Sequence, residues 1–221
     1  QEGGIPLLAA VLVNVSTRGN AKQGAGEVEE QKVARRSAMC ALVAKAIAQL
    51  TDRNRSNQTA MAAAGAVPPL VTMLTSPNVQ MQSNSALALA GLSSGHAENQ
   101  AIIARAGAIA PLCLMLRDGV AEVLEATAAA MWALSDGNQV NKMTIGKLAG
   151  IEPLVALTVN ASNDRAHERA VGALISLSFK MNDNRDLIAK LLVMRLGHRP
   201  GTPILVSAAA INVLSACCQL A

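Results

Sequence analysis

Aromatic residues are almost absent from this sequence: its 221 residues include one Trp, one Phe and no Tyr. Proteins that bind single-stranded nucleic acid stack bases on aromatic side chains, and Trp132, Phe179 and three histidines offer few rings for that purpose. We therefore expect no nucleic-acid partner. Charged residues are also scarce, at 15% against about a quarter of a typical globular chain.

Cysteine is rare as well, and its placement argues against a disulfide scaffold. Cys40 and Cys113 stand alone, whereas Cys217 and Cys218 are adjacent, and all four lie in apolar helical contexts. Buried free thiols are typical of a reducing compartment, so we expect an intracellular, cytoplasmic protein. The chain begins at Gln1 without Met, so we expect an incomplete N-terminus, which leaves the organelle open.

No segment has the length and composition of a transmembrane helix. The run 5–15 is too short for a bilayer core, and both this run and the run 204–218 contain Asn or Ser. The 51% hydrophobic content excludes a disordered chain. A core of Ala, Leu, Val, Ile and Met suits closely packed helices.

A repeat of about 42 residues organises the chain. One marker is Leu followed by Ser or Thr, with Asn seven residues after the Leu, and its copies are 42, 42 and 43 residues apart. The copies are Leu50-Thr51…Asn57, Leu92-Ser93…Asn99, Leu134-Ser135…Asn141 and Leu177-Ser178…Asn184. A second marker, Gly followed by Pro-Leu, places Pro69, Pro111 and Pro153 42 residues apart. Two markers with one period indicate a repeat protein.

Each repeat is predicted to form three helices. In the best-defined copy these helices cover 100–106, 109–117 and 120–135. Gly107 ends the first helix, because Gly adopts the left-handed conformation after a helix C-terminus. Pro111 lies in the first turn of the second helix, where its missing N–H costs nothing. The third helix carries apolar residues at three- and four-residue spacing, and no strand pattern competes.

The repeat resembles the armadillo repeat, and it is most similar to vacuolar-type armadillo proteins and plant U-box armadillo proteins. The residues that carry the resemblance are Ala129, Trp132, Leu134, Ser135, Asn141, Lys142, Ile145, Gly150, Ile151, Pro153, Leu154 and Val155. The resemblance implies an all-α, right-handed α-solenoid of about four full armadillo repeats plus partial repeats at both ends. We expect one domain over 1–221, with repeats at 1–57 (containing an inserted loop at 17–31), 58–99, 100–141 and 142–184 and a degenerate terminal repeat at 185–221. A last helix is expected at 204–218, and whether the chain continues beyond residues 1 and 221 stays open.

The resemblance also implies a concave face, lined by the third helices, that binds extended peptides or partner helices. Members such as importin-α grip a peptide with a ladder of Asn and Trp residues on this face. Here the Asn positions hold Gln49, Gly91, Ala133 and Ser176, and the Trp positions hold Lys45, Leu87, Ala129 and Gly172. Both ladders are missing, so nuclear-signal binding is disfavoured. We expect a smooth groove for an apolar helix or extended segment of a protein partner; alternatively, these residues pack against neighbouring helices and the register is shifted by one.

The net charge of +4 arises after Asn141. A basic patch is predicted there, formed by Lys142, Lys147, Arg165, Arg169, Lys180 and Arg185. Such a patch could meet an acidic surface of a partner. The alternative is an ordinary solvated helix face.

No catalytic constellation is visible, and no cofactor or metal site is predicted. His96, His167 and His198 lack Cys, Asp or Glu at metal-ligand spacing, and neither a P-loop nor a nucleophile elbow is present. The sequence therefore predicts a non-catalytic interaction scaffold or structural subunit of a larger complex. The alternatives are the substrate-recognition region of a ubiquitin ligase and an enzyme with an unrecognised site.

Overall fold

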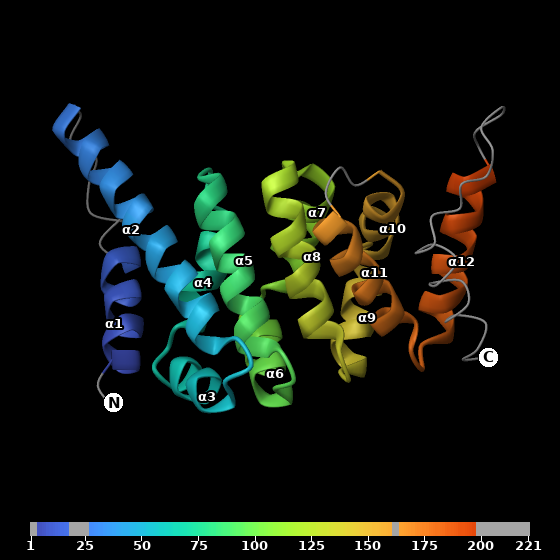
Figure 1. The fold of residues 1–221 in the computed structure, drawn as a ribbon, viewed down its shortest axis with the longest axis horizontal. Coiled ribbons are helices and arrows are strands. Elements are labelled where there is room, and N and C mark those ends of the chain that lie inside the picture. Colours follow the sequence, from blue (N-terminus) through green and yellow to red (C-terminus); the bar gives the residue numbers. More distant parts are fainter. Residues whose placement is uncertain (1–3, 18–26, 161–163, 198–221) are drawn as a thin grey trace. The chain divides into compact units, whose positions relative to one another are not determined.

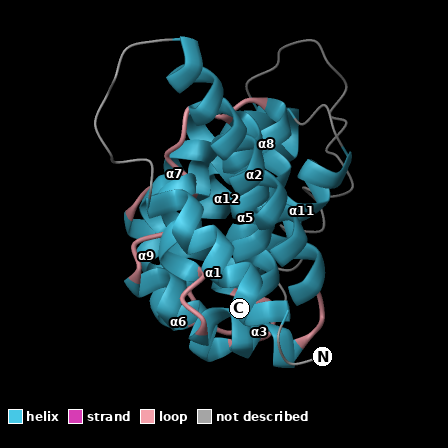
Figure 2. Ribbon diagram, turned by 90° about the vertical axis from the view of Figure 1, so that its left-hand side faces the viewer, coloured by secondary structure: helices cyan, strands magenta, loops and turns pink. Residues whose placement is uncertain are grey.

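A computed structural model of the protein describes residues 4–17, 27–160 and 164–197. Every regular element in these ranges is a helix, and the helices are joined by short loops (Figure 2). The chain divides into two compact units, an N-terminal unit of residues 1–108 and a C-terminal unit of residues 109–221. Each unit is described by itself.

The helices of both units follow the predicted order of first, second and third helix in each repeat (Figure 1). Those of the N-terminal unit are α1 (Gly4–Thr17), α2 (Glu27–Thr51), α3 (Arg55–Ala63), α4 (Val67–Met73), α5 (Val79–Ser93) and α6 (Ala97–Arg105). Those of the C-terminal unit are α7 (Ile109–Asp118), α8 (Ala121–Ser135), α9 (Gln139–Lys147), α10 (Ile151–Asn160), α11 (Asp164–Ser178) and α12 (Asn182–Gly197). The third helices are thus α2, α5, α8 and α11.

The predicted all-α architecture and the three helices at 100–106, 109–117 and 120–135 are confirmed, within one to three residues at each end. The loop predicted at 17–31 is wrong over its second half, because α2 begins at Glu27. Glu and Gln, which we interpreted as loop residues, are good helix formers. The remainder of that loop at 18–26, the turn at 198–203 and the helix expected at 204–218 lie outside the described residues. The proposed repeat boundaries stay a prediction.

Hydrogen bonds explain the first repeat marker. The Nδ2 atoms of Asn57, Asn99, Asn141 and Asn184 donate to the carbonyl oxygens of Leu50, Leu92, Leu134 and Leu177, at 2.7, 2.8, 2.8 and 3.1 Å. These carbonyls lie in the last turn of a third helix, where no helical N–H remains to bind them. The spacing of seven residues is therefore the distance along the chain at which the Asn amide reaches back to the end of the preceding helix.

The same asparagines also join one repeat to the next. Asn99 Nδ2 donates to the carbonyl of Gln58 at 3.1 Å, and Asn184 Nδ2 donates to the carbonyl of Lys142 at 3.3 Å. In return, Gln58 Nε2 donates to the carbonyls of Gly91 and Ser94 at 2.8 and 3.2 Å. These bonds satisfy buried polar groups at the repeat boundary.

The second marker needs one correction. Gly65 and Gly107 follow α3 and α6 with φ of +79° and +86°, the left-handed conformation that ends a helix. Gly150, which we aligned with them, lies one residue too far along. The equivalent position 42 residues after Gly107 is held by Ala149, with φ of +55°. Gly150 is instead small for packing, because a Cβ there would stand 2.9 Å from the sulfur of Cys113.

The core of each unit is aliphatic. In the N-terminal unit α2 packs on α5, and in the C-terminal unit α8 packs on α11. Leu12, Ile47, Leu70, Leu89 and Leu92 are fully buried in the first unit, and Leu112, Met131, Leu134, Leu174 and Leu177 in the second. No aromatic ring belongs to either list, so the two rings of the chain are available for another role.

The predicted state of the described cysteines is confirmed: Cys40 and Cys113 are free and buried. Cys217 and Cys218 lie outside the described residues. Among the helices that the structure describes, none is by itself long and apolar enough to cross a membrane, and only α6 and α7, taken together as a bent pair, would pass that test.

Candidate functional site

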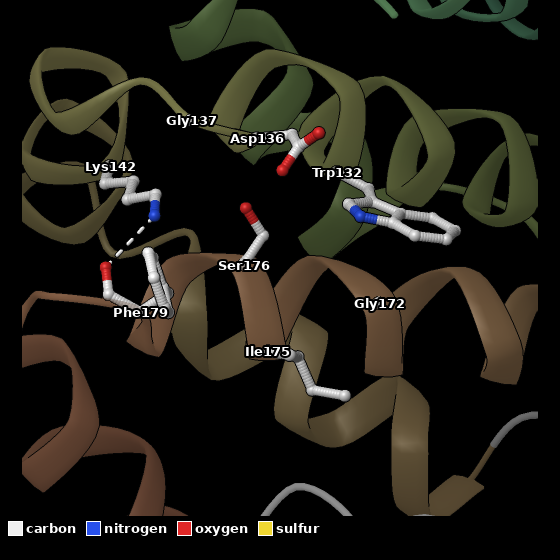
Figure 3. Close-up of a pocket in the computed structure, with 8 residues that line it drawn as sticks. All are labelled: Trp132, Asp136, Gly137, Lys142, Gly172, Ile175, Ser176 and Phe179. Atoms are coloured by element: carbon white, nitrogen blue, oxygen red, sulfur yellow. Dashed lines mark hydrogen bonds between the residues drawn. The ribbon is translucent and has the colours of Figure 1, made fainter. Parts of the chain in front are cut away.

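A pocket of about 400 Å³ opens in the C-terminal unit between α8, the turn after it, and α11. We call it the Trp132 pocket. Its lining residues are Trp132, Asp136, Gly137, Lys142, Gly172, Ile175, Ser176 and Phe179 (Figure 3). Both Trp132 and Phe179, which are the only Trp and Phe of the chain, therefore line one pocket.

Trp132 is positioned by Gly172. A Cβ at residue 172 would stand 2.8 Å from two atoms of the indole ring, closer than real contacts allow. The absence of a side chain at Gly172 therefore lets the ring lie flat against α11. Three residues earlier on α11, the Arg169 guanidinium lies 5.7 Å from the centroid of the Trp132 ring, within the range of a cation–π contact.

Phe179, which follows the last residue of α11, is 43% exposed. Two cations lie over its ring: the Nζ atoms of Lys142 and Lys180 are 5.2 and 5.4 Å from the ring centroid. Lys180 adopts φ of +58°, a conformation that Gly95 and Gly137 take at the equivalent turns of other repeats. A non-glycine residue there costs about 1 kcal/mol, so the turn keeps the lysine at some expense of stability.

Lys142 is almost fully buried, with 2% of its surface exposed. Its Nζ donates to the carbonyl oxygen of Phe179 at 3.0 Å, just beyond the C-terminus of α11 (Figure 3). A cation at this end of a helix is favourable. Burial lowers the pKa of Lys142, the nearby charge of Asp136 raises it, and that of Lys180 lowers it again. Asp136 thus acts as the electrostatic partner of Lys142 within the pocket.

Ser176 forms the floor of the pocket between α8 and α11. It is 8% exposed, and its hydroxyl makes a hydrogen bond with that of Ser135 at 2.9 Å. In Figure 3 the Ser176 side chain points toward α8, on the same side of α11 as Lys142, Asp136 and Trp132. The pocket is therefore an apolar cavity with charges at its margin.

The chain matches one family model. Residues 54–94 match Armadillo/beta-catenin-like repeat. The fold is that of an armadillo-repeat protein. No curated protein matches the chain significantly in sequence.

Solved armadillo structures of similar fold cover most of the chain. A designed armadillo repeat protein in complex with the peptide (KR)4 is 19% identical, with a TM-score of 0.68, and the match covers 96% of this chain and 99% of that one. The armadillo repeats only protein from Plasmodium falciparum is 18% identical, with a TM-score of 0.63 and 80% coverage of both chains. An engineered protein from a structural genomics consortium is 20% identical, with a TM-score of 0.76, over 98% of this chain and 82% of that one. At these identities the likeness shows the fold.

In the N-terminal unit, the armadillo register places the predicted groove residues on α2 and α5. Lys45 and Gln49 are exposed, and Leu87 is 37% exposed. Gly91 is half-buried, and a Cβ there would stand 2.5 Å from Thr51 Oγ1 on α2. Gly91 is therefore small because two armadillo third helices meet at this position, as in the alternative interpretation of the sequence.

In the C-terminal unit, Ala129 and Ala133 are half-buried on α8, while Gly172 and Ser176 line the Trp132 pocket. The two positions on α11 thus do face a cavity. The predicted smooth groove is wrong at this point, because Trp132 and Phe179 stand beside these small residues. Whether the groove residues bind a partner stays a prediction.

The predicted basic patch is only partly on the surface. Lys147, Arg165, Arg169 and Lys180 are exposed and Arg185 is half-buried, with a hydrogen bond to Asn182. Lys142 does not belong to a solvated patch, because it is buried against the end of α11. Its place 42 residues after Gln58, which makes the equivalent bond to Ser94, is the signal that could have shown this.

Trp132, Asp136, Ile175 and Phe179 were not predicted as site residues. The sequence held a signal for them, since Ile175 is 43 residues after Trp132 and so occupies the equivalent place on the next third helix. Phe179 is one helical turn beyond Ile175. Residues at equivalent places on successive third helices are neighbours in an armadillo stack.

Among the described residues, no group of three or more His, Cys, Asp or Glu side chains could hold a metal ion. His96 is instead a structural residue. It is the N-cap of α6, where its Nδ1 accepts from the N–H of Asn99 at 3.4 Å, and its Nε2 lies 3.0 Å from Thr59 Oγ1.

Proposed function

We propose that this armadillo protein is a non-catalytic interaction scaffold, and that the Trp132 pocket takes up one side chain of a bound protein segment. The observation that supports the proposal is the placement of both rings of the chain in one pocket on the third-helix side of α8 and α11. Aromatic side chains in a desolvated pocket are frequent centres of binding energy in protein interfaces. The peptide complex of a designed armadillo protein of similar fold agrees with this use of the third-helix surface.

Two other functions compete with a free adaptor. The chain could be the substrate-recognition region of a ubiquitin ligase or a fixed subunit of a large assembly, as the sequence interpretation allowed. Both also require binding of a protein segment, so the pocket serves the same purpose in each. We favour segment binding as the shared statement.

Trp132 supplies the test, because it is the only Trp of the chain and its emission reports on this pocket alone. Peptides from a random displayed library are selected on the folded 221-residue chain and then titrated while Trp132 fluorescence is followed. We expect selected peptides to shift the emission, and Phe179→Ala to weaken their binding at least about tenfold.

The matched control is Leu114→Ala in the same unit, which also removes an exposed apolar side chain, 50% against 43% exposed. We expect this variant to leave the affinity within about twofold, as for most surface truncations outside a binding site. Peptides that bind without changing Trp132 emission, and equally well to F179A, would reject the pocket as the binding site.

A further inference from the structure

We infer that the Trp132 pocket selects an acidic segment with an aliphatic side chain at its centre, an inference that rests on the proposed function. The aliphatic side chain would lie between Trp132 and Phe179. Its acidic neighbours would meet Arg169 at one end and Lys180 at the other. The argument depends on what already lies over the two rings.

Each ring has a cation of this chain over it. Arg169 lies 5.7 Å from the centroid of Trp132, and Lys180 lies 5.4 Å from that of Phe179. A Lys or Arg side chain from a partner would therefore meet a like charge at either ring. This arrangement disfavours a basic peptide such as (KR)4, which the designed armadillo protein binds.

The cations at the two ends are available for pairing. Arg169 and Lys180 are exposed, and neither forms a salt bridge with another side chain in the described part of the chain. The one carboxylate that lines the pocket, Asp136, interacts with the buried Lys142. The margin thus offers two positive charges to a ligand, and complementary charges direct both recognition and association rate.

The spacing of these cations sets the length of the segment. Arg169 and Lys180 are eleven residues apart, which corresponds to a rise of about 16 Å along a helix. An extended peptide covers that distance with about five residues. The apolar walls of Trp132, Ile175 and Phe179 lie between the two cations, so the aliphatic residue belongs near the middle.

The test titrates synthetic peptides against the full chain and follows Trp132 emission. The probe is Glu-Glu-Ser-Leu-Ser-Glu-Glu. Three matched peptides replace the Leu with Ala, the four Glu with Gln, or the four Glu with Lys. We expect the acidic Leu peptide to bind about tenfold or more tightly than each of the other three at low salt, and to lose that advantage as salt screens the charges.

Lys180→Gly separates binding from folding. It removes the cation and places Gly at a position with positive φ, so we expect it to raise the urea midpoint and weaken acidic-peptide binding about fivefold or more. The control is Arg53→Gly, which changes the equivalent turn of the N-terminal unit, where Arg53 has φ of +52°. It should also raise the midpoint and leave the affinity unchanged.

Equal or tighter binding of the Lys peptide, or an unchanged affinity in K180G, would overturn this inference while leaving segment binding intact. Emission shifts with phosphatidylserine vesicles in place of the acidic peptide would also overturn it, in favour of a membrane surface. If neither the four peptides nor any library peptide perturbs Trp132, the proposed function fails together with the inference.

Discussion

The indole ring of Trp132 lies directly against the α-carbon of Gly172, so that a β-carbon on residue 172 would stand 2.8 Å from the ring. The contact joins α8 to α11 and orients one wall of the pocket. Gly172→Ala must displace the ring, and we expect a loss of about 1–3 kcal/mol of stability. Trp132 emission should shift to longer wavelength. Gly4→Ala is the control, because no atom lies within 4 Å of its added Cβ, and it should leave emission unchanged.

Ala149 occupies a position that suits glycine. Its φ is +55°, and its side chain is exposed, so little packing is lost when the methyl group is removed. Ala149→Gly should raise the free energy of unfolding by about 1 kcal/mol. Gly107→Ala, at the equivalent turn with φ of +86°, should lower it by a similar amount. Urea unfolding of both variants checks the pair, and a destabilised A149G would contradict the assignment of this turn.

His96 caps α6 where Asn54 and Asn138 cap α3 and α9. His96→Ala removes the acceptor for the Asn99 N–H and should cost about 1–2 kcal/mol. His96→Asn keeps a cap of the type seen at the other two helices, so its loss should be smaller by about 1 kcal/mol. Thermal or urea unfolding measures the difference. Equal losses in the two variants would show that the imidazole acts by packing and by its bond to Thr59 rather than as a cap.

Cys113 should make stability fall at high pH. Burial raises the pKa of its thiol from 9.0 to about 11, an effect that Arg117 partly opposes. Between these values the folded chain keeps a proton that the unfolded chain releases. The free energy of unfolding therefore decreases as pH rises from about 9 to 11, by at most about 1.4 kcal/mol per unit, and is unaffected below.

The difference between the parent chain and Cys113→Ala isolates this effect from other groups that titrate in the same range. Urea unfolding under reducing conditions at several pH values between 8 and 11 gives the difference. We expect the parent chain to lose stability relative to C113A only above about pH 9. A constant difference across this range would mean that the thiol titrates alike in both states.

Much of the fold was predictable because its signals are local. The Leu-to-Asn spacing reflects a bond between a side-chain amide and a carbonyl seven residues back, and the Pro residues mark first turns of second helices. The start of α2 and the alignment of Gly150 were wrong for the same kind of reason. Composition alone does not separate a helix rich in Glu and Gln from a loop, and one extra residue between Asn141 and Asn184 shifts a glycine out of register.

The sequence by itself determined the repeat, its three helices and the armadillo fold, because each depends on contacts within about forty residues that recur along the chain. Tertiary structure alone decided what the rare side chains do. Trp132 and Phe179 are 47 residues apart, and only the packing of α8 on α11 brings them to one pocket. The burial of Lys142 and the close approach at Gly91 likewise depend on which faces of neighbouring third helices meet. A low aromatic content excluded an aromatic ladder, but two rings are enough to line a pocket when the fold places them together.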